Sequence, residues 1–136
     1  MSAHPRPGIG RPAALSALID IVLVAAFAAS GRASHGDSPL LGLWTTAWPF
    51  LTGLGAGWAV ARAWRAPIAP WRVGIPVWLV TVAGGMLLRR ASSQGTAWPF
   101  VVVASVVLFV LLVGWRLIAT GIERRRAASA TRSETP

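Results

Sequence analysis

The feature that most constrains this chain is an uncharged run of nineteen residues from Ala97 to Trp115. As an α-helix it would be about 28 Å long at about 1.5 Å per residue, close to the thickness of the hydrocarbon core of a bilayer. A soluble domain of 136 residues has too little interior to bury such a helix on every side. The run therefore predicts a membrane-spanning helix.

Three more apolar runs predict an all-α, polytopic membrane domain over residues 13–122. Its four transmembrane helices are expected at about 13–31, 44–61, 73–88 and 97–122. Pro49 is expected in the first turn of the second span, where a missing N–H costs little. Residues 1–12 contain three prolines and residues 123–136 are polar and basic, so both segments are predicted to be disordered tails.

The first run admits a second interpretation, because a basic start followed by an apolar stretch and small residues is also typical of a signal peptide. Asp20 lies inside this run, and a carboxylate is foreign to the apolar part of a signal peptide. A retained span is therefore favoured over a cleaved one.

Arginine placement predicts the orientation. All thirteen basic residues are Arg, and ten of them fall in the two tails, the 62–72 loop and the end of the fourth span. These segments lie on one side of the membrane in a four-span topology, and only Arg32, Arg89 and Arg90 fall on the opposite side. By the positive-inside bias, the chain is expected in the inner (plasma) membrane with both termini in the cytoplasm.

The string TAWPF occurs twice, at Thr46–Phe50 and Thr96–Phe100. With the orientation above, both copies enter from the outer face, with Trp48 and Trp98 as interface anchors. This pattern predicts two helical hairpins related as a parallel repeat. The alternative is that TAWPF is simply a suitable start for a helix at the outer interface.

Asp20 and Arg116 are the strongest candidates for a site, because a charge inside the bilayer is costly and normally faces a partner or water. Both lie at comparable depth from the cytoplasmic side, so an ion pair between them would neutralise both. The pair could be a structural clasp or an ion or proton site, and Arg116 could instead snorkel to the headgroups. Arg116 also shares a helix stripe that is expected to face inward, formed by Trp98, Val102, Ser105, Phe109, Leu112 and Arg116.

Other candidates are weaker. Arg32, His35 and Asp37 form an outer polar cluster that is either a base or pH sensor or an ordinary solvated loop. Arg124, Arg125 and Arg126 form a basic segment that anchors the chain and could bind anionic lipid headgroups. Four glycines are expected at helix contacts, either with a neighbour in the chain or with a second copy: Gly53, Gly57, Gly84 and Gly85. Four threonines could line a polar path or bond to their own helices: Thr45, Thr46, Thr52 and Thr81.

Several classes of function are disfavoured by composition and motifs. Charged residues make up only 12% of the chain and lie between apolar runs rather than on one polar face, so a nucleic-acid-binding role is not expected. There is no Cys and there are two His, which argues against a metal site or a thiol nucleophile. No nucleophile elbow, HExxH motif or paired carboxylates occur, so neither an enzyme nor a cofactor is expected.

Several short motifs occur in order: SGRASHG at Ser30–Gly36, TAWPF with a downstream GW, GGMLLR at Gly84–Arg89 and GWRL at Gly114–Leu117. Together they resemble the small actinobacterial membrane proteins grouped as domain-of-unknown-function 3054. The resemblance covers about Ala14 to Ile118. It implies four membrane spans and no established activity, and it assigns no catalytic residue.

Two functions are compatible with these observations. The first is a noncatalytic scaffold or accessory subunit with a membrane partner protein or a second copy of itself. The second is a small transporter or permeation subunit that uses the intramembrane Asp20 and requires a homo-oligomer, because four short helices enclose little room.

Overall fold

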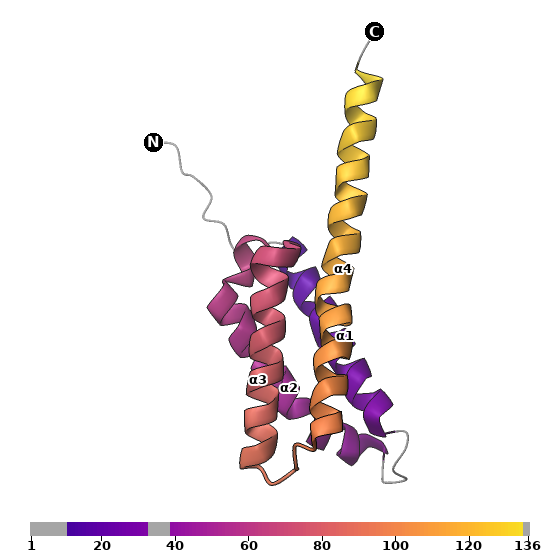
Figure 1. Cartoon of the computed structure of the whole chain (residues 1–136). Coiled ribbons are helices and arrows are strands. Elements are labelled where there is room, and N and C mark those ends of the chain that lie inside the picture. The colour runs from indigo at the N-terminus through magenta and orange to yellow at the C-terminus, as the bar shows by residue number, and fades with distance from the viewer. Residues whose placement is uncertain (1–10, 33–38, 135–136) are drawn as a thin grey trace.

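The computed structural model of the protein describes residues 11–32 and 39–134, and the only regular secondary structure in these parts is helical, with no strand (Figure 1). The four long helices are α1 (Arg11–Arg32), α2 (Pro39–Ala61), α3 (Ile75–Ala91) and α4 (Trp98–Ser133). Two short helical turns, η1 (Ala63–Arg65) and η2 (Pro70–Gly74), connect α2 to α3. Figure 1 shows this connector at the end of the bundle from which α4 projects.

Three helical segments of the described chain are long and apolar enough to cross a membrane, namely Pro12–Gly31, Pro70–Ala91 and Trp98–Ser133. These helices support the membrane location inferred from the sequence. The 23-residue helix α2 is uncharged, but its glycines, threonines and tryptophans lower its mean hydropathy, and it is not among the three. The fourth span thus stays a prediction.

Helix α2 begins earlier than expected. It starts at Pro39 rather than Trp44, so Pro49 lies ten residues inside it and the expectation of a first-turn proline is wrong. The apolar stretch Leu40 to Leu43 extends the helix backwards past the TAWPF string. In α4, by contrast, the matching proline is at the first positions of the helix, so the two TAWPF copies occupy different places in their helices.

The expectation of a disordered basic tail is also wrong for residues 123–133, which continue α4 as helix. The segment consists largely of Ala, Arg and Glu, which are good helix formers, and it contains neither glycine nor proline. This segment adds about 16 Å of exposed helix at about 1.5 Å per residue. We call residues 123–133 the arm.

Helices α2 and α3 pack closely through glycines, which is the role expected of them. A Cβ at Gly53 would lie 2.8 Å from the Thr81 carbonyl oxygen, and one at Gly57 would lie 3.0 Å from that of Val77. On α3, a Cβ at Gly84 would lie 3.2 Å from the Cα of Gly53, and one at Gly85 would collide with the Phe50 ring. The glycines expected at helix contacts therefore serve a neighbour within the chain.

An apolar core joins α1, α2 and α4 at the end remote from the connector. Phe27 and Phe50 meet edge to face with ring centroids 5.4 Å apart, and Phe100 packs against both rings. The core continues along α4 through residues spaced by four, Ala104, Leu108 and Leu112.

The inward face of α4 differs from the expected stripe. Ala104 and Leu108 face inward, whereas Trp98 is 76% exposed and Val102 is 45% exposed. Phe109 instead faces the flank next to α3, where the Trp78 ring packs edge to face on it and Trp78 Nε1 donates to the main-chain carbonyl of Ser105 at 2.9 Å. Only Leu112 and Arg116 of the expected stripe are buried in the bundle.

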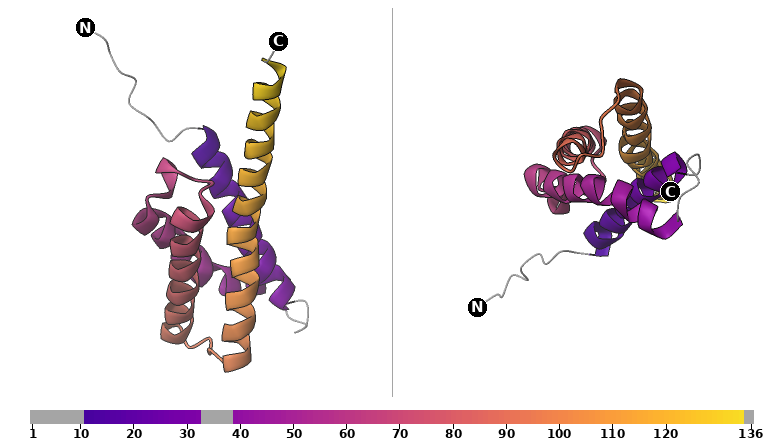
Figure 2. Two further views of the ribbon diagram at one scale, coloured as in Figure 1. Left: turned by 45° about the horizontal axis from the view of Figure 1, so that its top comes forward. Right: turned by 90° about the horizontal axis from the view of Figure 1, so that it is seen from below.

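The connector is fixed to α4 rather than hanging free. Helix α2 ends at Ala61 and is followed by Arg62, whose φ of 49° is in the left-handed region and turns the chain. The Thr120 hydroxyl of α4 donates to the Ile68 carbonyl at 3.2 Å. The left view of Figure 2 shows the connector end beside the middle of α4, with the arm continuing past it.

Candidate functional site

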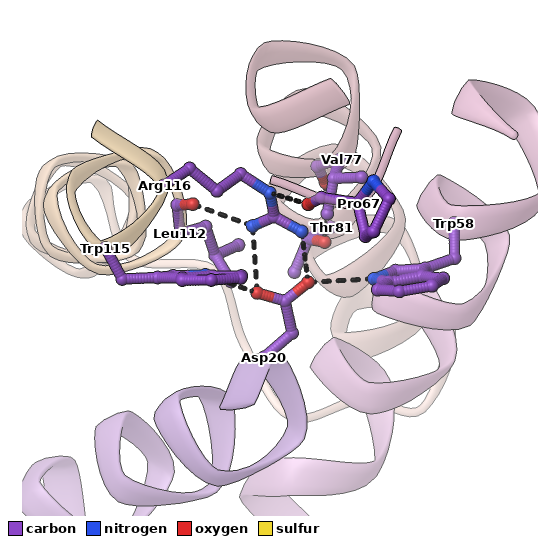
Figure 3. Close-up of polar contacts among 8 residues, drawn as sticks. All are labelled: Asp20, Trp58, Pro67, Val77, Thr81, Leu112, Trp115 and Arg116. Atoms are coloured by element: carbon purple, nitrogen blue, oxygen red, sulfur yellow. Dashed lines mark hydrogen bonds and ion pairs between the residues drawn. The ribbon is translucent and has the colours of Figure 1, made fainter. Parts of the chain in front are cut away.

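The polar centre of the bundle is the pair formed by Asp20 of α1 and Arg116 of α4 (Figure 3). The guanidinium binds the carboxylate with both of its terminal nitrogens: Nη1 lies 2.9 Å from Oδ1 and Nη2 lies 2.6 Å from Oδ2. Both side chains are fully buried, with 0% exposure. The ion pair suggested by the sequence is thus formed, and snorkelling of Arg116 towards the headgroups is not seen.

Two tryptophans complete the ligation of the carboxylate. Trp58 Nε1 of α2 donates to Oδ2 and Trp115 Nε1 of α4 donates to Oδ1, both at 2.8 Å. Figure 3 shows the two indoles approaching Asp20 from opposite sides. The carboxylate therefore accepts four hydrogen bonds from three side chains, and each of its oxygens has two donors.

The Arg116 guanidinium makes two more hydrogen bonds, both to backbone carbonyls. Its Nε donates to Pro67 O at 2.9 Å, and Nη1 donates to Leu112 O at 2.8 Å. Its carbon also lies 4.7 Å from the centre of the Trp115 ring, within range of a cation–π contact. Arg116 thereby links the connector to α4 while it holds α1.

Local sequence explains how these side chains reach one point. Along α1, the buried residues Ser16, Asp20, Val24 and Phe27 recur every three or four positions, which is one face of a helix. Asp20 is the one charged residue of this inward-facing stripe. On the far side, Gly74 leaves room for Arg116, since a Cβ there would lie 3.3 Å from Arg116 Cδ.

We call Asp20, Arg116, Trp58, Trp115 and the Pro67 carbonyl the clasp. A planar guanidinium matches a carboxylate through two parallel hydrogen bonds, which a lysine could not form. The pair cancels its own charge, and the indoles and carbonyls satisfy most of the remaining bonding capacity. Chemically, this arrangement fastens α1, α2 and the connector to α4.

Three of the four threonines proposed as lining for a polar path bond to their own helices. Thr45, Thr52 and Thr81 each donate to the carbonyl four residues earlier, at 2.9, 2.8 and 2.6 Å. Such internal bonds are the ordinary use of a hydroxyl inside a helix.

None of the remaining candidate residues that the structure describes belongs to the clasp. The cluster of Arg32, His35 and Asp37 falls outside the described residues, since residues 33–38 and the Arg32 side chain are not described. Of the expected interface anchors, Trp98 is exposed at the start of α4, whereas Trp48 is partly buried in the interior of α2. Residues 124–126 are exposed on the arm.

Sequence reasoning missed Trp58, Trp115 and the Pro67 carbonyl. A usable signal existed for the tryptophans, because each follows a glycine in an apolar run and an indole N–H at that depth needs an acceptor. Asp20 was the one strong acceptor available at that depth. Nothing comparable marked Pro67, since any carbonyl in the 62–72 loop could have met the guanidinium.

Comparison with known proteins identifies one family. The family model described as Protein of unknown function (DUF3054) matches residues 17–119, which is most of the chain and includes the side chains of the clasp. No curated protein and no solved structure matches the chain.

Proposed function

We propose that this chain, which belongs to the family described as Protein of unknown function (DUF3054), is a noncatalytic multi-pass membrane protein that serves as a scaffold or accessory subunit. The observation that carries the proposal is the state of Asp20. Its carboxylate is fully buried and accepts four hydrogen bonds, so its bonding capacity is already used inside the protein.

A transport role would need Asp20 to exchange a proton or an ion with water. Freeing this carboxylate would leave the buried guanidinium of Arg116 without its counter-charge, and breaking a buried pair in this way costs about 3 to 5 kcal/mol. Three of the four threonine hydroxyls considered for a polar path, those of Thr45, Thr52 and Thr81, are bonded within their own helices. These contacts favour a permanent clasp over a site that opens in each transport cycle.

The outward faces of the helices supply surface for lipid or a partner. Leu15, Leu18 and Val22 of α1 are each more than half exposed, and so are Val103, Val106 and Val110 of α4. The clasp would hold these two helices at a fixed spacing. A scaffold needs such a rigid, apolar surface, and it needs no reacting group.

Within the proposal, α2 is the fourth membrane span, and both termini lie in the cytoplasm. The connector supports this orientation because Arg62, Arg65 and Arg72 are exposed there, at the same end of the bundle as the arm. Positive residues at one end of a bundle are typical of the cytoplasmic side. Reporter fusions within residues 62–72 and after Pro136 should both report the cytoplasm, and an external signal from either would refute the orientation.

Flux through purified protein is the direct test of a noncatalytic, nontransporting role. Wild-type protein and the Asp20→Asn variant would be reconstituted in liposomes, and proton and monovalent cation flux would be measured with a fluorescent dye. The proposal predicts flux equal to that of empty liposomes for both proteins. Flux in the wild type that is lost in Asp20→Asn would overturn it in favour of a transporter.

Site-specific photo-crosslinking in cells is the complementary test of the scaffold role. A crosslinker at Leu18 or Val106, both exposed, should capture one membrane protein in a position-dependent way. The same crosslinker at the fully buried Leu108 is the matched control and should capture nothing. If the exposed positions also capture nothing but lipid, the scaffold role is refuted.

A further inference from the structure

An apolar groove of about 390 Å³ runs between α1 and α2 on the outside of the bundle. It is lined by Ala17, Ile21, Leu51, Leu54, Gly55 and Trp58. Its volume is in the range of small-molecule sites, which bury most of an apolar ligand against a preformed concave surface. A Cβ at Gly55 would meet nothing within 4 Å, so the groove is open at this point.

With α2 as a membrane span, as proposed above, the position of the groove along this helix lies in the hydrocarbon layer. From Leu51 to Trp58 the helix rises about 10 Å at about 1.5 Å per residue. The connector follows directly, and its Trp64 and Trp71 are exposed, as expected of aromatic residues at the headgroup level. The groove thus starts about one helical turn below the membrane interface.

Positive charge lies where the groove meets the interface. Leu51, Leu54, Gly55 and Trp58 follow one another at the spacing of a single helix face, and Arg62 is the next step, just past the end of α2. Arg62 and Arg65 are both exposed, and the 62–72 segment contains no acidic residue. An apolar groove with unneutralised guanidinium groups at one end complements a molecule with a hydrocarbon chain and an anionic head.

We propose that this groove binds an anionic phospholipid, with an acyl chain between α1 and α2 and its phosphate on Arg62 and Arg65. Arginine is well suited to phosphate because its planar fork can donate two hydrogen bonds at once. The acyl chain lies against Trp58, whose N–H is committed to Asp20, so the lipid covers the outer side of the clasp.

A second copy of the chain fits the groove less well. Two copies in one membrane have the same orientation, so a symmetric contact along the groove brings the Arg62 and Arg65 residues of both copies to the same depth. Like charges at such a contact repel, whereas an anionic headgroup neutralises them. The proposal rests on the proposed position of α2 as a membrane span with the connector at the interface, and it is independent of the scaffold role.

Lipid binding to the purified full chain in detergent tests the proposal. Native mass spectrometry would measure retention of phosphatidylglycerol and of phosphatidylcholine with identical acyl chains. Two variants separate the parts of the site: Gly55→Leu fills the groove, and Arg62→Gln removes one headgroup contact. Their matched controls are Gly121→Leu, where a Cβ also meets nothing within 4 Å, and Arg132→Gln on the arm.

The wild type should retain phosphatidylglycerol about tenfold more tightly than phosphatidylcholine, as one charge-assisted contact supplies. Gly55→Leu should weaken the retention of both lipids about tenfold. Arg62→Gln should remove most of the preference for phosphatidylglycerol over phosphatidylcholine. Both controls should match the wild type. The unfolding temperature of each variant in detergent would show that it is folded, which the open space at Gly55 leads us to expect.

Three results would overturn the proposal. Unchanged retention in folded Gly55→Leu would mean that the acyl chain lies elsewhere. An unchanged lipid preference in Arg62→Gln and in the double variant with Arg65→Gln would mean that the connector does not bind the headgroup. A change in oligomer mass in Gly55→Leu without a change in lipid retention would assign the groove to a second copy.

Discussion

Removing Asp20 and Arg116 separately and together is the most informative perturbation of the clasp. Asp20→Asn keeps the shape of the side chain but leaves a fully buried guanidinium without a counter-charge. Arg116→Leu leaves a buried carboxylate with two indole donors. Each single change should therefore cost about 3 to 5 kcal/mol in the free energy of unfolding.

The double variant should lose far less than the two single losses together. Two buried polar groups lack a suitable hydrogen-bond partner in the double variant. The asparagine amide turns its NH₂ towards one indole N–H, and the Pro67 carbonyl loses its donor. An unsatisfied buried group costs about 1 to 3 kcal/mol, so the double loss should be about 2 to 6 kcal/mol and the coupling energy roughly 4 kcal/mol.

The assay is chemical unfolding in a single detergent, followed by tryptophan fluorescence, for the wild type and the three variants. Arg116→Lys is a useful fourth variant, because it restores the charge but cannot bond both carboxylate oxygens and Pro67 together. It should fall between the wild type and Arg116→Leu. Strictly additive single losses would refute the reasoning, since the two residues would then not depend on each other.

Other predictions concern packing, the indoles and the arm. Gly53→Ala should lower the unfolding temperature by several degrees because its Cβ would meet the Thr81 carbonyl, whereas Gly55→Ala should not lower it. Trp58→Phe keeps an aromatic ring but removes one hydrogen bond to a charged group, so it should cost about 1.5 to 3 kcal/mol in chemical unfolding. Replacing residues 124–126 by glutamine should leave the unfolding free energy unchanged, because these residues are exposed, and should weaken binding to vesicles of anionic lipid in a flotation assay. A loss of stability in that variant, or unchanged flotation, would contradict the role given to the arm.

The parts of the fold that the sequence predicts are those governed by hydrophobicity and charge. Asp20 and Arg116 could be paired from sequence because an isolated charge in an apolar helix needs a partner, and each was the other's best candidate at that depth. The sequence also predicts that the glycines lie at close helix contacts, because backbone approach is how helices associate in lipid. It does not predict which helix they contact.

The errors arose where local signals competed with packing. Pro49 looked like the start of a helix because proline is favoured there, but the apolar residues before it extend α2 backwards. The arm looked disordered because it is polar, although its composition favours helix and α4 provides a formed helix to extend. The indoles of the clasp required three-dimensional information, since the chain has eight tryptophans and only contact with Asp20 distinguishes two of them.

The central claim, a closed ion pair between Asp20 and Arg116, can be tested most directly by solid-state NMR of the full chain in lipid bilayers. The chain has only two aspartates, Asp20 and Asp37, so ¹³C labelling of aspartate gives two carboxylate signals. With ¹⁵N-labelled arginine, one of them should couple strongly to guanidinium nitrogens, as oxygen to nitrogen distances of 2.9 and 2.6 Å require. That signal should receive little magnetisation from water protons. An Asp20 carboxylate that couples to water and not to a guanidinium would contradict the account.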